Sequence, residues 1–337
     1  MGKVRLADIA ERVGVSTVTV HNALAGQKGV SDEMREKILE VAEEMGYLQM
    51  TAARKLERGR TMKNIGVIIS EKYLAEYTTF YWKMYQELAL IATDKNCMVA
   101  VEILKHETEC SLTMPRIMEE RTVDGLIIMG DISRNYIRVM KKRSGGMPII
   151  FLDFYDKELA EDAVIADNFY GMYLLTELLY SRGLRKMAYV GSIHHTSSIM
   201  DRYCGFYKAL MEHGEELPPQ WLIEDRDEIG YMKNIELPEH MPEAFVCNCD
   251  LAAEILIVKL EENGYRVPED VSVVGFDNYL YPGFPDKKIT SYEVDTKAMA
   301  KSALEKVLRQ LRNSSSGKGL DVVSGHIVEK ETVRQCK

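Results

Sequence analysis

The sequence predicts an all-α helix-turn-helix headpiece joined to an α/β body of two doubly wound, Rossmann-like lobes. Three observations lead to this fold class. The first fifty residues carry short stripes of apolar residues at helical spacing. From residue 64 onward, short uninterrupted apolar runs alternate with helical stretches, which is typical of parallel strands buried on both faces. This alternation occurs in two successive sets, which favours two lobes with a cleft between them.

Length and composition favour a soluble protein with more than one domain. The chain has 337 residues, of which 46% are hydrophobic and 28% charged, so it can bury a sizeable core and is not wholly disordered. No apolar run approaches the roughly 18 residues of a membrane span, and the N-terminus lacks the apolar stretch of a signal peptide. Six unevenly spaced cysteines do not form a secreted disulfide framework. We therefore predict a cytoplasmic protein without membrane contact.

Charge is unevenly distributed along the chain. Residues 1–63 contain eleven Lys and Arg against nine Asp and Glu, whereas the rest of the chain has 32 against 43. Between residues 54 and 63, five cations are opposed only by Glu57. This asymmetry is typical of a nucleic-acid-binding head on an acidic body, and a solvated basic linker would also produce it.

Residues 1–50 divide into three short helices that form the headpiece. Apolar residues at i, i+3, i+4 and i+7 make one helical face, and Gly14 ends that first helix. Ser16 is a good N-cap for a second helix, Thr17 to about Leu24. After the loop AGQKG, Ser31 is the N-cap of the third helix. Two helices joined by a tight Gly-containing turn, with a third across them, form a helix-turn-helix.

The second helix presents short side chains suited to reading DNA. Its outward positions are Thr17, Val18, His21 and Asn22, and hydroxyls at Ser16 and Thr19 could reach phosphates. Asn pairs best with adenine N6 and N7, and Val offers only apolar contact, most naturally with a thymine methyl group. For His21, a phosphate contact or a solvent-facing side chain is favoured over base reading.

These residues resemble the headpiece of LacI/GalR-type transcriptional regulators. The segments RLADIAERVGVSTVTVHNALAG, VSDEMREKILEVAEEMGY and TAARKL are similar to that family's first two helices, third helix and hinge. Where the family usually has Ser-Arg, this chain has His21-Asn22, so we expect the half-site to depart from the usual guanine at the position read by Asn22. The resemblance implies DNA contacts from the second helix, from Ser31 and from the hinge.

By the same resemblance, residues 51–63 are a hinge helix and linker. The segment TAARKLE is too short to be helical alone in water, and the resemblance implies that it folds on the operator, one hinge helix per subunit. With Arg54 two residues before it, Leu56 matches the family's leucine wedge in the minor groove. There, unstacking costs on the order of a few kcal/mol and is offset by contacts to the bent DNA. An ordinary linker leucine is the alternative.

The body, residues 64–337, resembles the family's periplasmic-binding-protein-like core. Motifs in the expected order include VDGLIIMG, DRYCGF, PEDVSVVGFDN and ITSYEVD. We assign the N-lobe to residues 64–162 and 292–321. The C-lobe is assigned to residues 163–291 and 322–335, with AVIAD as its first strand.

This resemblance implies an effector cleft at the carboxyl ends of the strands. Arg202 in R-x-x-GF and Asp277 in GFDN match the family's polar clamps, and Asp153 and Asp250 are further candidates. Carboxylates accept paired hydrogen bonds from adjacent hydroxyls while Arg donates two, so this set fits a sugar. Phe80 matches an aromatic lid over the ligand, and a core position on its own helix explains it equally well.

Two departures from the family pattern bear on the ligand. Cys249 precedes Asp250 where the family usually has Asn. The stretch DRDEIGYMKN replaces most of a helix, and Asp225 and Asp227 add acidity there. We therefore expect a reshaped pocket, and a non-sugar metabolite or a protein corepressor is the alternative to a sugar effector.

The sequence contains no convincing motif for catalysis, a metal or a cofactor. No glycine-rich phosphate loop follows a strand, HETEC is not a zinc-protease motif, and Cys247-x-Cys249 has no second pair. Asp167 and Asn168 in DN-x-x-G are expected to hold a helix start. We predict no enzyme activity and no cofactor.

Together, the residues and the resemblance imply a homodimeric transcription factor, a repressor, that binds double-stranded DNA at a pseudo-palindromic operator under the control of a small ligand. A sugar-binding module without a regulatory role is the alternative from another class. The intact headpiece disfavours it.

Overall fold

In the computed structural model the chain divides into two compact units, residues 1–62 and 63–337. The structure describes residues 5–24, 30–45, 47, 62–74, 80–156, 158–159, 162–312 and 319–335. Arg54 and Leu56 of the predicted hinge lie outside the described residues, so their roles stay predictions. In the part of the chain that is described, no helix is long and apolar enough to cross a membrane.

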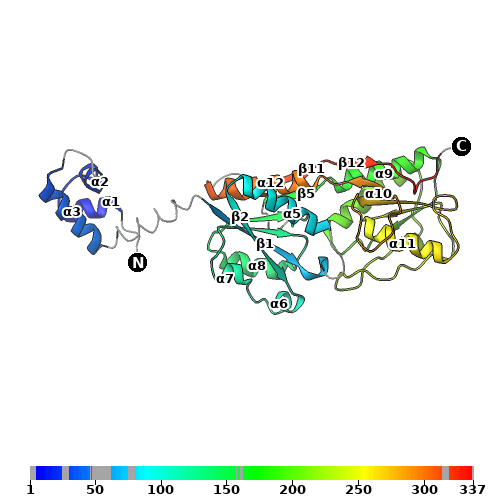
Figure 1. The fold of residues 1–337 in the computed structure, drawn as a ribbon, viewed down its shortest axis with the longest axis horizontal. Helices are drawn as coiled ribbons and strands as arrows, with labels where there is room; N and C mark the ends of the chain where they lie inside the picture. Colours follow the sequence, from blue (N-terminus) through cyan, green and yellow to red (C-terminus); the bar gives the residue numbers. More distant parts are fainter. Residues whose placement is uncertain are drawn as a thin grey trace. The chain divides into compact units, whose positions relative to one another are not determined.

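The smaller unit contains the three predicted helices, α1 (Leu6–Val13), α2 (Thr17–Leu24) and α3 (Asp32–Glu44) (Figure 1). Gly14 ends α1 with a φ of 79°, a left-handed conformation that suits glycine. The hydroxyls of Ser16 and Ser31 accept from the amides three residues on, at 3.1 and 3.4 Å. These bonds satisfy amides that the first turns of α2 and α3 leave without a helical partner.

Six buried apolar side chains from all three helices form the core of this unit: Ile9, Ala10, Val20, Ala23, Ile38 and Ala42. Because α2 buries only Val20 and Ala23 among its eight residues, its remaining surface is available for other contacts.

The larger unit contains two six-stranded sheets (Figure 1). The first sheet is parallel throughout, with strand order β11-β5-β4-β3-β1-β2. Its strands are β1 (Lys63–Ser70), β2 (Cys97–Leu104), β3 (Gly125–Met129), β4 (Ile149–Leu152), β5 (Asp162–Ala166) and β11 (Leu320–Val323). One face is covered by α5 (Phe80–Asp94) and α12 (Thr296–Arg312), the other by α7 (Arg116–Glu119) and α8 (Arg134–Arg143). The short helices η1 (Glu71–Tyr73) and α6 (His106–Cys110) follow β1 and β2.

The second sheet has strand order β12-β10-β9-β8-β6-β7. Its strands are β6 (Met187–Val190), β7 (Leu222–Ile223), β8 (Ala244–Cys247), β9 (Ser272–Asp277), β10 (Thr290–Glu293) and β12 (His326–Val328). The β10–β12 pair is antiparallel and the other pairs are parallel. One face is covered by α9 (Asn168–Ser181) and α10 (Ser197–Glu212), the other by α11 (Asp250–Glu262), and η2 (Pro219–Trp221) precedes β7.

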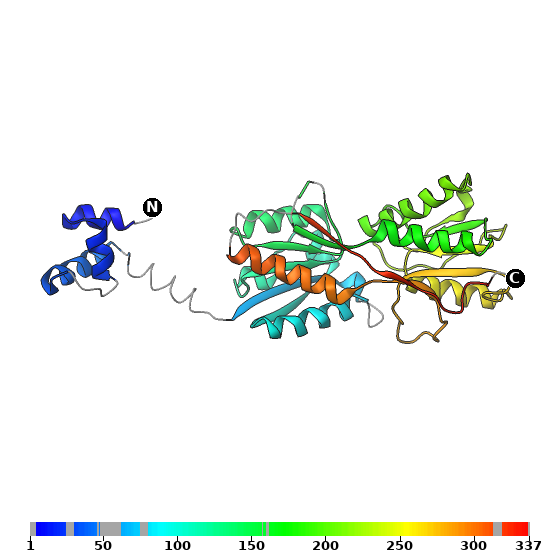
Figure 2. The ribbon, with the colours of Figure 1, turned by 90° about the horizontal axis from the view of Figure 1, so that it is seen from above.

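The predicted lobe boundaries need one correction. The strand assigned to the start of the C-lobe, β5, pairs with β4 and β11 in the first sheet. The chain therefore changes lobes after β5, between β10 and α12, and between β11 and β12 (Figure 2). An apolar pattern shows that a strand is buried but not which sheet it joins, since that depends on pairing with strands far along the chain. We call the parts built on the first and second sheets the N-lobe and the C-lobe.

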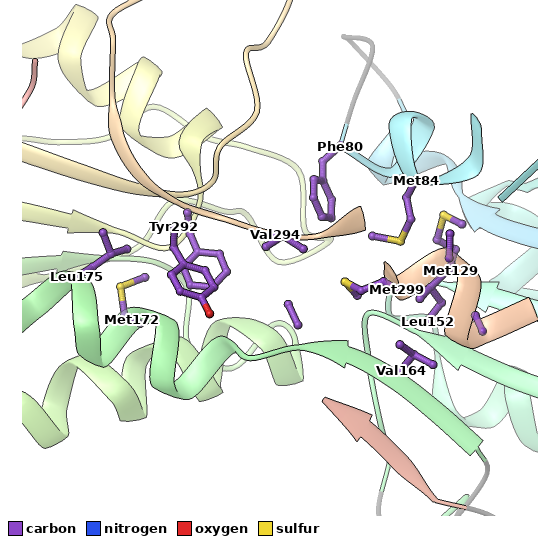
Figure 3. Close-up of a cluster of buried hydrophobic side chains, with 14 of the residues drawn as sticks. Phe80, Met84, Met129, Leu152, Val164, Met172, Leu175, Tyr292, Val294 and Met299 are labelled. Atoms are coloured by element: carbon purple, nitrogen blue, oxygen red, sulfur yellow. The ribbon is translucent and has the colours of Figure 1, made fainter. Parts of the chain in front are cut away.

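One hydrophobic cluster continues through both lobes (Figure 3). The N-lobe contributes Met84, Met129 and Met299 among others, and the C-lobe contributes Met172 and Tyr292. The Tyr292 hydroxyl also accepts from the Gly325 amide at 2.7 Å, which fixes the segment between β11 and β12. The segments in which the chain passes from one lobe to the other are therefore packed in this apolar cluster, which holds the lobes together near their junction.

Replacing Gly205 with Ala should destabilise the C-lobe. Here α10 approaches α9 so closely that a Cβ on Gly205 would lie 2.0 Å from the carbonyl oxygen of Phe169. We expect a loss of about 1–3 kcal/mol in the free energy of unfolding from overpacking, although Ala is about 1 kcal/mol better than Gly in a helix. Chemical denaturation measures the free energy of unfolding of the variant and of the wild type. Cys204→Ala, at the exposed neighbouring position, is the control. An unchanged midpoint for Gly205→Ala would contradict the close approach of the two helices.

Candidate ligand cavity and DNA-facing helix

A cavity of about 330 Å³ lies between the two lobes, where strands of both sheets end. The N-lobe lines it with residues that follow β1 and β4 and with the start of α5, and the C-lobe lines it with α10 and the segments after β7, β8 and β9. Its volume is at the small end of the range of about 300–1,000 Å³ that is usual for ligand pockets. The position agrees with the cleft predicted at the carboxyl ends of parallel strands.

Arg202 of α10 is buried at the cavity wall and held on every side. Its Nε donates to Asn168 Oδ1 at 2.8 Å, and its Nη1 donates to the carbonyl of Asn248 at 2.6 Å. Nη2 lies 3.3 Å from Asp277 Oδ1, an ion pair, and the guanidinium lies 4.0 Å from the ring centroid of Phe276. The predicted clamp residues Arg202 and Asp277 are therefore in contact, and the guanidinium has a fixed orientation.

Asp153 and Asp277 bring two carboxylates to the same cavity from opposite lobes. Both follow or end a strand with a positive φ, 67° and 102°, a conformation that costs energy in non-glycine residues and turns the chain sharply there. Asp153 Oδ2 accepts from the Tyr81 hydroxyl at 2.8 Å. No donor among the described residues makes a hydrogen bond to the buried Oδ1 atom of either side chain. Both can therefore accept from a ligand, and Asp277 Oδ1 would do so beside the guanidinium of Arg202.

Burial changes the acidity of both carboxyl groups. It raises the pKa of Asp277 to about 7, against the opposing charge of Arg202 and with a further increase from Asp153. The pKa of Asp153 is also raised by burial, with Arg202 and the Tyr81 hydroxyl acting in the opposite direction. Both groups are thus poised to respond to a charged or hydrogen-bonding ligand.

Aromatic rings line the N-lobe side of the cavity. Tyr73 and Tyr81 contact each other with ring centroids 4.5 Å apart, and Phe80 meets Tyr81 edge-on at 5.7 Å. Phe80 is 5% exposed and belongs to the large hydrophobic cluster, yet it also lines the cavity. Its two predicted roles, core residue and aromatic wall, are therefore compatible.

Asp250 does not line the cavity, so its prediction as an effector contact is corrected. Its Oδ2 accepts from the Tyr279 amide and its Oδ1 from the Ser291 hydroxyl, each at 2.8 Å. Gly275 is the close neighbour that leaves room for this carboxylate. Asp250 is thus occupied beneath the cavity, where it holds the turn that follows Asp277.

Within the departing stretch DRDEIGYMKN, residues 225–234, residues 226–233 form a strap along the C-lobe side of the cavity. Arg226 and Met232 pair across it as an antiparallel bridge. At its tip the Asp227 carboxylate accepts from three backbone amides, those of residues 229–231. Asp225, which we expected to add acidity, is fully buried and ion-paired with Arg226.

Several cavity residues were missed by sequence reasoning: Lys72, Tyr73, Tyr81, Asn248, Arg226, Tyr231 and Tyr281. The strap sequence was recognised as a departure from the family pattern, but nothing in it indicated that Arg226 lines the cavity. Asp167 does cap α9 as predicted, since its carboxylate accepts from the Tyr170 amide at 3.3 Å. Asn168 does more than start that helix, because it also orients Arg202.

In the smaller unit, the predicted DNA-contacting residues gather on and beside α2. Ser16, Thr17, Val18, His21 and Ser31 are exposed, with Val18 at 65%, and Thr19 and Asn22 are partly exposed. The hydroxyls of Ser16 and Thr19 lie 2.8 Å apart. A nearly apolar core on one side and exposed short side chains on the other give α2 the character of a reading helix.

Comparison with known proteins decides the family. Residues 5–49 match the family described as bacterial regulatory proteins, lacI family, and residues 176–333 match the periplasmic binding protein-like domain. The chain belongs to the LacI family. Both the fold class and the family that the sequence indicated are thereby confirmed.

Three similar proteins cover nearly the whole chain. The HTH-type transcriptional repressor PurR of Mannheimia succiniciproducens is 26% identical over 337 residues, with 98% of each chain covered. The lac repressor dimer bound to operator and the anti-inducer ONPF has a TM-score of 0.64 at 22% identity, over 98% of this chain and 99% of that one. The transcriptional regulator CelR in complex with cellobiose has a TM-score of 0.67 at 18% identity, over 98% and 100%. The two structures show that this LacI-family chain shares their fold.

Replacing Asp277 with Asn tests its raised pKa through stability. A carboxyl group with a pKa of about 7 in the folded protein, above its usual 3.8, binds its proton more tightly when folded. Stability from this group is therefore lost as pH rises between those values. Asn does not titrate, so the Tm of the wild type should fall relative to that of Asp277→Asn as the pH rises from about 4 to about 7. Above pH 7 the difference in Tm should stay constant.

Asp94→Asn, at the exposed end of α5, controls for the loss of one carboxylate. A pH-independent difference for Asp277→Asn would contradict the raised pKa.

Proposed function

We propose that this LacI-family protein is a homodimeric transcriptional repressor whose operator affinity is controlled by a sugar or sugar derivative bound between its lobes. The observation that carries the proposal is the pairing, in one chain, of an exposed reading helix with a cavity that holds Arg202 and two available carboxylate oxygens. A relative named as a transcriptional repressor and a solved dimer on its operator support the regulatory part.

The DNA-binding role rests on α2. We propose that Asn22 reads adenine in the major groove, that Val18 contacts a thymine methyl group, and that Ser16 and Thr19 contact phosphates. A two-fold symmetric dimer would place two such helices on half-sites about one helical turn apart. Sedimentation of the full chain tests the dimer directly.

The ligand is proposed from the chemistry of the cavity. Oxygen atoms of Asp153 and Asp277 can each accept from a hydroxyl, and aromatic rings beside them can pack on the apolar face of a sugar ring. The solved complex of CelR with cellobiose supports a sugar as the ligand in this fold. A ligand that contacts both lobes favours the form in which they lie close together.

Control of DNA binding follows from unequal binding to two forms. A ligand can shift the separation of the lobes only if it binds their closed and open arrangements with different affinity. The chain enters the N-lobe at Lys63, the first residue of β1, directly after the predicted hinge. Movement of the N-lobe in each subunit would therefore change the separation of the two hinges and so the fit to the operator.

Replacing Asn22 with Ala should weaken operator binding and relax base preference at one position of each half-site. We expect a loss of about 1–3 kcal/mol, or roughly 5- to 150-fold, for an operator found by binding-site selection. Affinity for random DNA should stay unchanged. Fluorescence anisotropy gives the dissociation constants for the selected operator and for random DNA, and their ratio measures the specificity.

Glu40→Gln on the exposed side of α3 is the control, because removing one negative charge should strengthen binding to both DNAs alike. A selected site in which guanine still dominates at the position read by Asn22 would contradict the assignment.

A thermal-shift screen of the full chain tests the ligand. Sugars, sugar phosphates and nucleobases are compared, and a ligand at about a hundred times its Kd should stabilise the protein by roughly 2.7 kcal/mol. Arg202→Lys should abolish the shift, because Lys cannot make the paired hydrogen bonds of the guanidinium. Arg266→Lys, at an exposed pair with Asp270, is the matched control.

The outcomes separate the alternatives. A nucleobase hit would replace the sugar and keep the regulator. Specific operator binding without any small-molecule shift would favour a protein corepressor.

A further inference from the structure

Two cations line the cavity, one from each lobe. Lys72 belongs to η1, directly after β1 in the N-lobe, and Arg226 begins the strap of the C-lobe. Burial lowers the pKa of Lys72, and the charge of Arg226 lowers it further, whereas Asp131 and Glu109 act in the opposite direction. Both side chains line the same cavity, and a neutral ligand would leave their charges there without an added anion.

The positive charge of Arg226 is paired with a buried carboxylate, that of Asp225. Its Nη1 donates to Asp225 and to Asn248 Oδ1, both of them buried, and its Nη2 donates to the Cys249 sulfur at 3.8 Å. Five N–H groups are available on a guanidinium, so donors remain for an acceptor in the cavity. The buried Asp225 fixes the position of the guanidinium, and Arg226 still lines the cavity.

Lys72 has no such support. Within the described ranges no carboxylate forms an ion pair with its ammonium, which lies 5.0 Å from the ring centroid of Tyr73. The strap lies against this side chain: a Cβ on Gly230 would be 3.5 Å from Lys72 Cδ and 3.7 Å from the Nδ1 of His195. Asp131 and Glu109 act on this ammonium without forming an ion pair with it, so an anion on the ligand would supply the direct counter-ion that the described residues do not.

The opposite requirement holds near Asp153 and Asp277, where buried carboxylate oxygens need donors. We propose that the ligand is an anionic sugar, which presents a carboxylate or phosphate group to Lys72 and Arg226 and its hydroxyl groups to Asp153 and Asp277. This inference rests on the proposed function and narrows the effector to a sugar acid or a sugar phosphate. The anion lies across the two lobes, so it stabilises their closed form through charge-assisted hydrogen bonds.

The first experiment uses inorganic phosphate as the probe on the full chain. Phosphate stabilises most proteins by being excluded from their surface, so the measurement is the Tm gained over chloride at equal ionic strength, compared between the wild type and Lys72→Gln. The wild type should gain more than the variant. Lys288→Gln, at an exposed pair with Asp286 and not among the residues that line the cavity, is the control and should behave like the wild type.

The second experiment compares matched sugars by calorimetry: glucose, glucuronate and glucose 6-phosphate, and ribose with ribose 5-phosphate. Within a series, the charged member should bind at least about tenfold more tightly than the neutral one, and Lys72→Gln should remove that preference. Glucuronate and glucose 6-phosphate separate a sugar acid from a sugar phosphate.

Equal phosphate effects in the wild type and Lys72→Gln would overturn the inference, as would neutral sugars binding as tightly as their charged counterparts. Either result leaves the proposed repressor intact if operator binding persists. Failure of the full chain to bind any selected operator would instead contradict the proposed function itself.

Discussion

Arg202 is the side chain on which the geometry of the cavity depends. A buried guanidinium is tolerated only where its donors find acceptors, and here those acceptors come from three separate elements: Asn168 at the start of α9, the carbonyl of Asn248 after β8, and Asp277 at the end of β9. The ion therefore holds the carboxyl ends of two strands and the start of α9 in one arrangement. Removing it would leave Asp277 buried without its counter-ion and release each of these elements.

The same dependence explains why the neighbouring carboxylates have different roles. Asp250 and Asp277 both lie near strand ends of the C-lobe and both are buried. Asp250 has each oxygen occupied, by Ser291 and Tyr279, so it is a structural support. In Asp277 the Oδ1 atom lies 3.3 Å from Arg202 Nη2, and no donor among the described residues makes a hydrogen bond to it. Only the second arrangement has capacity left for a ligand.

Most of the architecture could be read from local patterns, whereas much of the cavity could not. Alternating apolar runs and caps such as Ser16 and Gly14 are local, and they correctly indicated the headpiece helices and both doubly wound lobes. Membership of a strand in a sheet is not local, which is why β5 was assigned to the wrong lobe. Arg202 and Asp277 stood in motifs, but Arg226 and Lys72 did not. Their significance arises only when the strap and η1, some 150 residues apart in the sequence, come together.

The strand β1 connects the two ends of the proposed mechanism. It begins at Lys63, next to the hinge, and ends at Ser70, two residues before Lys72 in the cavity wall. Eight residues at about 3.3 Å each make a rod of roughly 26 Å, and it pairs with β2 and β3 on either side, so it moves with its sheet. A ligand that draws Lys72 towards the strap therefore acts on the N-lobe as a whole. In the part of the chain that is described, three segments pass between the lobes, so rotation there would require few backbone changes. In the proposed mechanism the displacement would then reach the hinge through the sheet itself.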